Sequence, residues 1–196
     1  MKVGVLGGSF DPVHNGHLAI ALAAVEQVGL DRVVFVPARR SPLKGASPRA
    51  ADEDRVAMLE AATRDEPRFA VSRVELDRAA PSYTVDTLEA MAGDDRLYLI
   101  LGADAAADLA RWRDPERVLR LATLVVASRD RVPVPESAIV LDTPLIDLSA
   151  RDLRERAARG RSLRYLVPDA VWRYIEDRGL YRARMSVGGA SASQTS

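Results

Sequence analysis

The two histidines of the chain, His14 and His17, lie three positions apart in the segment GGSFDPVHNGH, which covers residues 7–17. An imidazole donates a directed hydrogen bond and can become cationic beside a phosphate, so two imidazoles within one turn can act on the same anion. Gly7 and Gly8 allow backbone amides to approach a ligand closely. The segment therefore predicts a site for a phosphate-bearing ligand.

Other interpretations of this segment stay open on the residues alone. A histidine at the start of a helix can also serve as a cap or pack against its neighbours. A zinc site formed by the histidines and Asp11 lacks a further ligand at an evident spacing, and the chain has no cysteine. Asp11 followed by Pro12 is also typical of a turn. The segment is neither a Walker loop, which ends in Gly-Lys-Ser/Thr, nor a GxGxxG dinucleotide turn.

Apolar strands and helices alternate along the chain. We expect strands at residues 2–6, 32–36, 69–76, 97–101, 123–127 and 139–141. We expect helices at residues 17–28, 52–63, 84–92, 104–110, 115–121, 150–159 and 168–178. Strands separated by helices pair in parallel, so the expected fold class is α/β, a doubly wound Rossmann-like parallel sheet with a small C-terminal helical appendage. Ligands of such sheets bind beyond the carboxyl ends of the strands, where the histidine segment lies.

Length and composition indicate one globular domain. The chain has 196 residues, of which 47% are hydrophobic and 29% charged, with no apolar run of about 18 residues, so we expect a soluble, cytoplasmic protein. We expect a single domain over residues 1–182, with the helical appendage at about 150–182, and a disordered tail over 183–196. The 28 basic and 28 acidic residues balance, so neither nucleic acid nor a membrane is expected as a partner. The sequence leaves the oligomeric state open, a homo-oligomer included.

Five ordered motifs resemble those of a known family. The segment GGSFDPVHNGH resembles the GGxFDPxHxGH signature of the HxGH nucleotidyltransferases, and the remaining motifs are similar to those of their bacterial nicotinate-nucleotide adenylyltransferase branch. These motifs are SYTVDT at residues 82–87, GAD at 102–104 followed by Trp112, LSARDLR at 148–154, similar to ISxTxIR, and RYLVP at 164–168. Ordered motifs together are more specific than any one of them, and the likeness covers roughly residues 1–181.

The resemblance implies a reaction without an activated protein nucleophile. It implies transfer of AMP from ATP to nicotinate mononucleotide, which forms nicotinate adenine dinucleotide and pyrophosphate in NAD biosynthesis. The attacking phosphate is already anionic at neutral pH, so direct in-line attack needs no covalent intermediate and no general base. The barrier is electrostatic, because one anion must approach another. Mg²⁺ is expected with ATP, held mainly by phosphate oxygens and water, and no protein metal ligands are expected.

The resemblance also implies the residues of the site. The catalytic residues are His14, His17, Lys44 and Arg154. The ATP-binding residues are Gly8, Ser9, Phe10, Gly16, Gly102, Asp104 and Ser149. Tyr83, Thr84 and Trp112 are expected to bind nicotinate mononucleotide, with the pyridine ring stacked on Trp112. Ser149 is expected to cap a helix whose N-terminus faces the phosphates.

Some of these residues have simpler interpretations. Lys44 fits a solvated loop lysine, although it is one of two lysines in the chain. Arg154 stands in an arginine-rich stretch typical of a solvated helix face, and only its motif position selects it. Trp112 fits the core equally well. The chain also departs from the branch at Arg151, where Thr or Ser is usual, and at residues 79–80, where Ala-Ala replaces a glycine-containing turn.

Two other functions stay open. The same chemistry on nicotinamide mononucleotide or phosphopantetheine is one of them. SYTVDT and Trp112 favour a pyridine acceptor, whereas the choice between acid and amide depends on which donors face the carboxylate. A non-catalytic nucleotide-binding sensor is the other, and the retention of His14, His17, Lys44 and Arg154 disfavours it.

Overall fold

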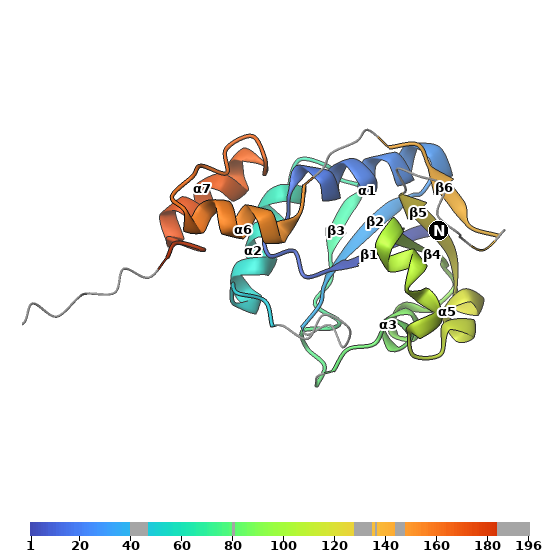
Figure 1. Cartoon of the computed structure of the whole chain (residues 1–196). Coiled ribbons are helices and arrows are strands. Elements are labelled where there is room, and N and C mark those ends of the chain that lie inside the picture. Colours follow the sequence, from blue (N-terminus) through green and yellow to red (C-terminus); the bar gives the residue numbers. More distant parts are fainter. Residues whose placement is uncertain (40–46, 80, 128–134, 136, 144–147, 184–196) are drawn as a thin grey trace, which may run out of the picture.

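The structure, a computed structural model of the chain, contains a six-stranded sheet with the order β3-β2-β1-β4-β5-β6 (Figure 1). It describes residues 1–39, 47–79, 81–127, 135, 137–143 and 148–183. The strands are β1 (Lys2–Gly8), β2 (Arg32–Pro37), β3 (Phe69–Val71), β4 (Arg96–Gly102), β5 (Ala122–Ala127) and β6 (Ile139–Leu141). Every neighbouring pair is parallel, and Val5 of β1 lies between Val34 of β2 and Leu99 of β4. The predicted doubly wound α/β class is confirmed.

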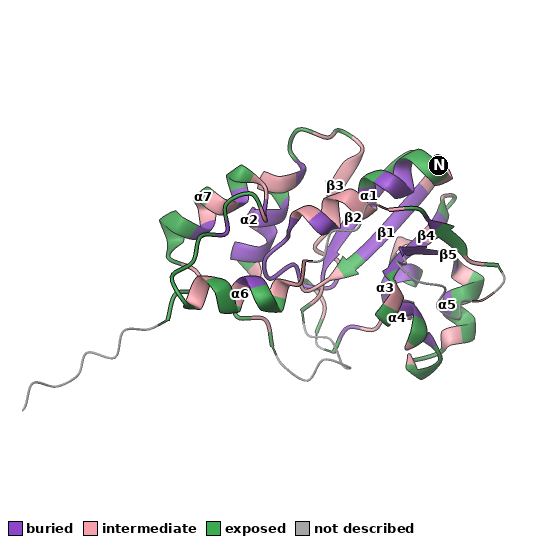
Figure 2. Ribbon diagram, turned by 45° about the horizontal axis from the view of Figure 1, so that its top comes forward, coloured by how far each residue is buried: buried purple, intermediate pink, exposed green. Residues whose placement is uncertain are grey.

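Helices connect the strands and cover both faces of the sheet (Figures 1 and 2). They are α1 (Asn15–Val28), α2 (Asp52–Thr63), α3 (Thr84–Met91), α4 (Ala103–Ala107), α5 (Pro115–Leu121), α6 (Ala150–Ala158) and α7 (Asp169–Arg178), with a short 3-10 helix at Leu109–Arg111. Because successive strand residues point to opposite faces, the apolar side chains form two clusters. The first core cluster, with Phe35 and Ile100, packs under α1 and α2, and the second core cluster, with Val5 and Leu99, packs under α3 and α5.

One predicted strand is much shorter than expected. The strand expected at residues 69–76 ends at Val71, and Asp77 N donates to Arg73 O in a following turn. Along β2, Val33 N donates to Arg68 O, and the corresponding donor farther along would come from Pro37, which has no amide hydrogen. The ladder therefore stops there.

The helix expected at residues 104–110 is divided. Helix α4 ends at Ala107, and the 3-10 helix follows with a hydrogen bond from Trp112 N to Leu109 O. This tighter turn places Trp112 against the second core cluster. Helix α1 begins at Asn15, two residues before the predicted start, because His14 occupies the N-cap position.

The C-terminal helices are attached to the rest of the chain through α2. Tyr174 Oη donates to Asp54 Oδ1 at 2.9 Å, and Arg178 Nη2 donates to the same oxygen at 3.1 Å. The predicted C-terminal helix is thus present, while the boundary between domain and tail stays a prediction, with residues 184–196 outside the described part. Within the described ranges, no helix is both long and apolar enough to cross a membrane.

Candidate functional site

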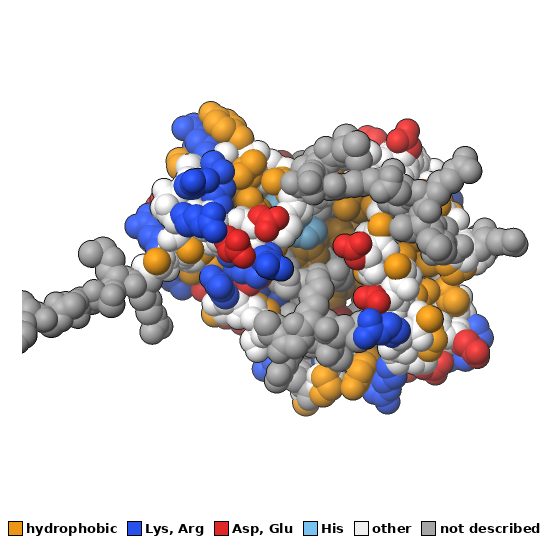
Figure 3. Space-filling view, viewed as in Figure 1, with side chains coloured by type: hydrophobic (Ala, Val, Ile, Leu, Met, Phe, Trp, Pro, Cys, Tyr) orange, Lys and Arg blue, Asp and Glu red, His pale blue; other side chains and the backbone are white. Residues whose placement is uncertain are grey.

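The site lies beyond the carboxyl ends of β1 and β4, which are neighbours in the sheet. The chain leaves β1 toward β2 and leaves β4 toward β5, so the two connections diverge and open a crevice between them. In Figure 3 a histidine surface lies in a hollow near the middle of this face, and Lys and Arg side chains gather on the side of α6 and α7. This is the place that the sequence predicts for ligand binding.

Phe10 shapes the loop that follows β1. Its backbone has a φ of 45°, in the left-handed region, and its ring is buried in the first core cluster. A Cβ at Gly8 would lie 3.2 Å from this ring, so glycine permits the close approach. The Phe10 and His17 rings pack edge to face, with centroids 5.0 Å apart. The Phe10 side chain therefore packs in the core and holds the loop and the His17 ring in place.

The histidines are held against one another. His14 N donates to His17 Nδ1 at 3.2 Å, and the rings stack with centroids 3.7 Å apart and an interplanar angle of 24°. Because His17 Nδ1 accepts this bond, the neutral His17 ring carries its proton on Nε2. His14 is buried, and burial lowers its pKa from 6.5 to about 4, so it is neutral at pH 7. His14 is the N-cap residue of α1, and its ring stacks on that of His17. A role as a helix cap therefore does not exclude a position of both histidines near one ligand.

Both carboxylate oxygens of Asp11 accept hydrogen bonds from other parts of the protein. The residue is 2% exposed, and its carboxylate accepts from Arg49 N at 2.8 Å, Ala50 N at 3.0 Å and Tyr181 Oη at 2.8 Å. These donors occupy oxygens that a zinc ion would need. Across the described ranges, no group of three or more His, Cys, Asp or Glu side chains is placed to hold a metal ion.

Arg154 contacts the histidine loop at Asp11. Its Nη1 donates to Asp11 O at 2.7 Å and lies 3.5 Å from Asp11 Oδ2, and its side chain is 21% exposed. Arg151, by contrast, is 79% exposed and pairs with Glu155. Ser149 Oγ caps α6 by accepting from Asp152 N at 3.3 Å. Arg154 is therefore not a solvated helix-face arginine, and α6 begins beside the loop that carries the histidines.

Two contacts join the RYLVP segment to the same loop. Asn15 N donates to Leu166 O at 3.2 Å, and Asn15 Nδ2 donates to Tyr165 O at 2.9 Å. Tyr165 has a φ of 70° and is 81% exposed. The RYLVP motif thus lies at the N-terminus of α1, next to His14.

Sequence reasoning missed Arg55. This residue of α2 is fully buried, and its Nη1 donates to Ser9 O at 2.7 Å while its Nη2 pairs with Asp52 at 2.6 Å. Arg55 therefore fixes the backbone of the loop at Ser9. An arginine three residues after an aspartate in a helix is typical of a surface pair, so the sequence carries no signal of its burial.

Tyr83 and Trp112 lie on the other half of the site. Tyr83 is the N-cap residue of α3, Thr84 is its first residue, and the Arg113 guanidinium lies 4.7 Å above the Tyr83 ring. Trp112 packs against the second core cluster, and its Nε1 is buried with no hydrogen-bond partner among the residues described. The contact between Arg113 and Tyr83 thus brings the turn that carries Trp112 close to Tyr83.

A buried glutamate anchors the SYTVDT segment. Thr87 Oγ1 donates to Glu75 Oε1 at 2.8 Å, and Ser82 Oγ donates to Glu75 O at 3.4 Å. Burial raises the pKa of Glu75, and the hydrogen bond from Thr87 opposes that rise. Sequence reasoning missed Glu75 as well, because its partners follow it by 7 and 12 positions.

The remaining predicted residues have simpler surroundings. Gly102 ends β4 and is the N-cap residue of α4, and Asp104 is exposed in the first turn of that helix. Gly16 is buried in the first turn of α1. Lys44 and Ala80 lie outside the described residues. The structure thus places Gly102 and Asp104 on the β4 side of the crevice and the histidine loop on the β1 side.

Comparison with known proteins defines the class first. The model of the cytidylyltransferase-like family matches residues 5–156, which include the sheet and most of α6. A protein named "Probable nicotinate-nucleotide adenylyltransferase" from Roseiflexus sp. (strain RS-1) is 48% identical over 194 residues, covering 92% of this chain and 98% of the relative. A protein of the same name from Thermus thermophilus is 47% identical over 188 residues, covering 93% and 100%. The chain therefore belongs to the nicotinate-nucleotide adenylyltransferase family.

Solved structures agree on the fold. Nicotinic acid mononucleotide adenylyltransferase from Plasmodium falciparum, complexed with NaAD, superimposes with a TM-score of 0.74 at 16% identity, covering 92% of this chain and 97% of that one. A putative nicotinate-nucleotide adenylyltransferase from Vibrio parahaemolyticus gives a TM-score of 0.68, also at 16% identity, covering 92% and 95%. At this identity the likeness supports the architecture.

Proposed function

We propose that this protein transfers AMP from ATP to the phosphate of nicotinate mononucleotide and releases pyrophosphate. The observation that carries the proposal is the stacked His14–His17 pair at the N-terminus of α1, in a loop that Arg154 contacts at Asp11, in a member of the nicotinate-nucleotide adenylyltransferase family. A phosphate oxygen of the mononucleotide forms a bond to the α-phosphorus of ATP. The bond from that phosphorus to the bridging oxygen breaks, and pyrophosphate leaves with the electron pair.

Electrostatic stabilisation is the main task of the residues around the triphosphate. His17 presents Nε2–H as a hydrogen-bond donor because its Nδ1 accepts from His14 N. The N-terminus of α1 adds the positive end of the helix dipole. Arg154 supplies a planar fork for the β- or γ-phosphate, and Lys44 supplies a point charge. These groups stabilise charge that develops in the transition state without taking a proton from the nucleophile.

The rest of the nucleotide site is proposed from motif and position. Gly8, Ser9, Phe10 and Gly16 contribute the backbone of the loop and of the first turn of α1. Gly102 and Asp104 contribute at the end of β4, and Ser149 contributes at the start of α6. ATP enters as its Mg²⁺ complex, a substrate whose ion is held mainly by phosphate oxygens and water.

The acceptor site is proposed across the crevice, at Tyr83, Thr84 and Trp112. The Trp112 ring offers a flat surface for the pyridine ring. Tyr83 and Thr84 stand at the N-terminus of α3, where backbone N–H groups and a hydroxyl can bind a carboxylate. This arrangement favours the acid over the amide, because a donor facing an amide N–H₂ group would lack an acceptor.

The deciding experiment measures pyrophosphate release from ATP and Mg²⁺ with three acceptors in parallel. The expected order places nicotinate mononucleotide first, nicotinamide mononucleotide well below it, and phosphopantetheine at background. Mass spectrometry should identify nicotinate adenine dinucleotide as the product. Equal rates with the acid and the amide would contradict the acceptor assignment. Nucleotide binding without turnover of any acceptor would instead support a sensor.

A further inference from the structure

We infer that Tyr181 is a positioning residue of the ATP site, which acts through Asp11 to leave Arg154 available for the triphosphate. Tyr181 Oη donates to Asp11 Oδ1 at 2.8 Å across 170 positions of sequence. The inference rests on the proposed function, since it assumes that Arg154 binds ATP phosphates. It concerns a residue outside the five motifs, near the C-terminal end of the described chain.

The backbone of Tyr181 adopts an unfavourable conformation in order to make this contact. Helix α7 ends at a left-handed Gly179, and Leu180 N donates back to Ile175 O. Tyr181 then adopts a φ of 64°, which is unfavourable for a bulky side chain and persists where surrounding contacts compensate for it. Its ring packs against the first core cluster, and its hydroxyl reaches Asp11. The turn after α7 therefore serves to deliver this hydroxyl.

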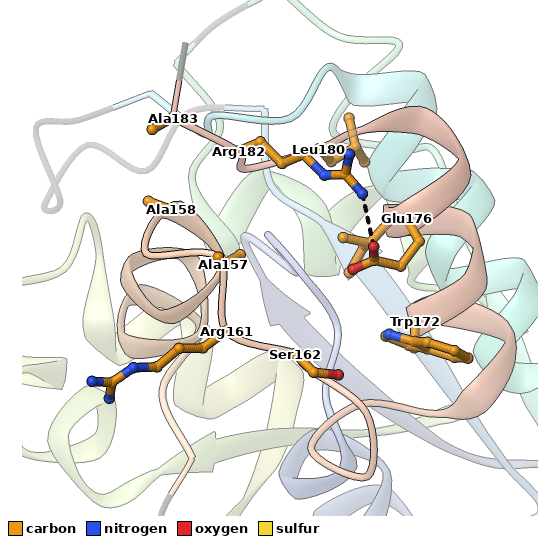
Figure 4. Close-up of a pocket in the computed structure, with 11 residues that line it drawn as sticks. Ala157, Ala158, Arg161, Ser162, Trp172, Glu176, Leu180, Arg182 and Ala183 are labelled. Atoms are coloured by element: carbon orange, nitrogen blue, oxygen red, sulfur yellow. Dashed lines mark hydrogen bonds and ion pairs between the residues drawn. The ribbon is translucent and has the colours of Figure 1, made fainter. Parts of the chain in front are cut away.

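The neighbours of Tyr181 lie on a different surface. Leu180 and Arg182 line a pocket of about 420 Å³ between α6 and α7, shown in Figure 4, and Arg182 pairs there with Glu176 at 2.8 Å. The lining of this pocket contains none of the residues expected for the nucleotide site. Tyr181 is thus directed to the histidine loop by a segment whose adjacent side chains line a separate pocket.

Four groups surround the two carboxylate oxygens of Asp11. Oδ1 accepts from Tyr181 Oη and Ala50 N, and Oδ2 accepts from Arg49 N. Arg154 Nη1 lies 3.5 Å from Oδ2, which is longer than the 2.7–2.9 Å typical of a direct charge-assisted hydrogen bond. The three neutral donors thus supply the hydrogen bonds of the carboxylate. Arg154 Nη1 donates to the backbone oxygen of Asp11 at 2.7 Å and makes only the longer contact with the carboxylate.

Loss of the hydroxyl changes this balance in a definite direction. Burial and the neighbouring Asp11 carboxylate raise the pKa of Tyr181, so its hydroxyl stays protonated and remains a donor. Without that donor, Oδ1 loses one of its two hydrogen bonds, and the carboxylate attracts the Arg154 guanidinium more strongly. A triphosphate must then compete with Asp11 for Arg154. The expected defect lies in ATP binding, while the acceptor site across the crevice is unaffected.

The test is Tyr181→Phe, which keeps the ring that packs against the core. Its dissociation constant for MgATP, measured by calorimetry without acceptor, should rise by roughly tenfold, which is typical for loss of one hydrogen bond to a charged group. The KM for ATP should rise in parallel, and the KM for nicotinate mononucleotide should change less than about twofold. Thermal unfolding is measured first, and binding is compared at a temperature at which every variant is folded.

The chain offers a matched control on helix α7. Tyr174→Phe removes the same kind of hydroxyl-to-carboxylate bond, but at Asp54 in α2. It should lower the thermal stability to a similar degree and leave the dissociation constant for MgATP unchanged. If Tyr181→Phe binds MgATP as tightly as the wild type, or if Tyr174→Phe is equally impaired, the inference is overturned.

A double-variant cycle separates action through Arg154 from a direct effect. In an Arg154→Ala background, Tyr181→Phe should weaken MgATP binding by less than about twofold further. A full additional loss would overturn the inference, because the hydroxyl would then act elsewhere. Failure of the proposed function is a distinct result. A wild-type protein that binds MgATP but forms no dinucleotide refutes the reaction, and the binding measurements on Tyr181 remain valid.

Discussion

The backbone amide of His14 donates to Nδ1 of His17 at 3.2 Å while the two rings stack 3.7 Å apart, so one histidine fixes the tautomer of the other. The His14 side chain is buried and neutral at pH 7, and the His17 ring, whose Nδ1 accepts this bond, directs Nε2–H. The pair therefore divides its tasks, with His14 building the turn and His17 offering the donor. Substitution of His17 tests the second task, and the pH dependence of stability tests the environment of His14.

His17→Ala should lower kcat by about 10²- to 10³-fold, the usual effect of removing a donor that stabilises transition-state charge. The fold should persist, because the His17 ring makes one edge-to-face contact with Phe10 and is not one of the apolar side chains of the first core cluster. Steady-state kinetics and circular dichroism provide the measurement. A variant with wild-type kcat would falsify the role of His17, and an unfolded variant would assign it to packing.

The buried His14 should make stability depend on pH. Its pKa is lowered from 6.5 to about 4 in the folded protein, so between these values the unfolded chain binds more protons than the folded one. Stability therefore rises with pH in this window and is lost as pH falls from about 6.5 toward 4. The contribution is at most about 3 to 4 kcal/mol, since one pKa unit corresponds to about 1.4 kcal/mol.

Urea unfolding at several pH values between about 4.5 and 7.5, with buffers on the order of half a unit apart, measures this slope. The His14→Gln variant should be less stable at neutral pH and should show a flatter dependence below pH 6.5. A variant whose slope equals that of the wild type would show that other groups produce the effect.

The sheet could be predicted from the sequence because its signals are local. Apolar runs such as those that became β1, β4 and β5 are buried on both faces, and Ser149 stands one residue before the helix that it caps. The predicted strand beyond Val71 was wrong because its limit is set by Pro37 on the neighbouring strand. Alternation in one strand carries no information about the partner that must donate to it.

The supporting residues of the site could not be predicted for the same reason. Asp11 has the sequence context of a turn residue, yet its partners Ala50, Arg154 and Tyr181 are 39, 143 and 170 positions away. Motif position selected Arg154, but not the contact that holds it. Interactions between distant positions depend on how the helices dock, and a single sequence has no pattern that reports docking.

Arg55→Leu should destabilise the protein by about 3 kcal/mol, because it leaves the Ser9 carbonyl and Asp52 without their donor. The loop after β1 should also become more mobile, because Arg55 no longer holds the Ser9 carbonyl. The KM for ATP, measured at a temperature at which the variant is folded, should therefore rise. Arg151→Ala is the control, since this exposed arginine pairs with Glu155 at the surface and its loss should cost less than about 1 kcal/mol. Equal unfolding free energies for the two variants would contradict the supporting role of Arg55.

Trp112→Ala should raise the KM for nicotinate mononucleotide by up to about tenfold and change the KM for ATP much less, because the ring is proposed to stack on the pyridine. Trp112→Phe should recover most of the loss. The chain provides a control in Trp172, the other of its two tryptophans, which lines the α6–α7 pocket. If Trp112→Ala raises both KM values equally, or only lowers the melting temperature, Trp112 is a core residue and not an acceptor contact.

Chelation should separate activity from stability. Pyrophosphate release is expected to stop in excess EDTA and to return on addition of Mg²⁺, because the ion neutralises the triphosphate before attack. The melting temperature of the protein without nucleotide should stay the same in EDTA, since no metal-binding group of three or more side chains exists among the residues that the structure describes. MgATP, in contrast, should raise the melting temperature by binding only the folded state, and EDTA should reduce that rise. A fall in the melting temperature of the nucleotide-free protein on chelation would reveal a structural ion and would contradict the assignment of the metal to the substrate.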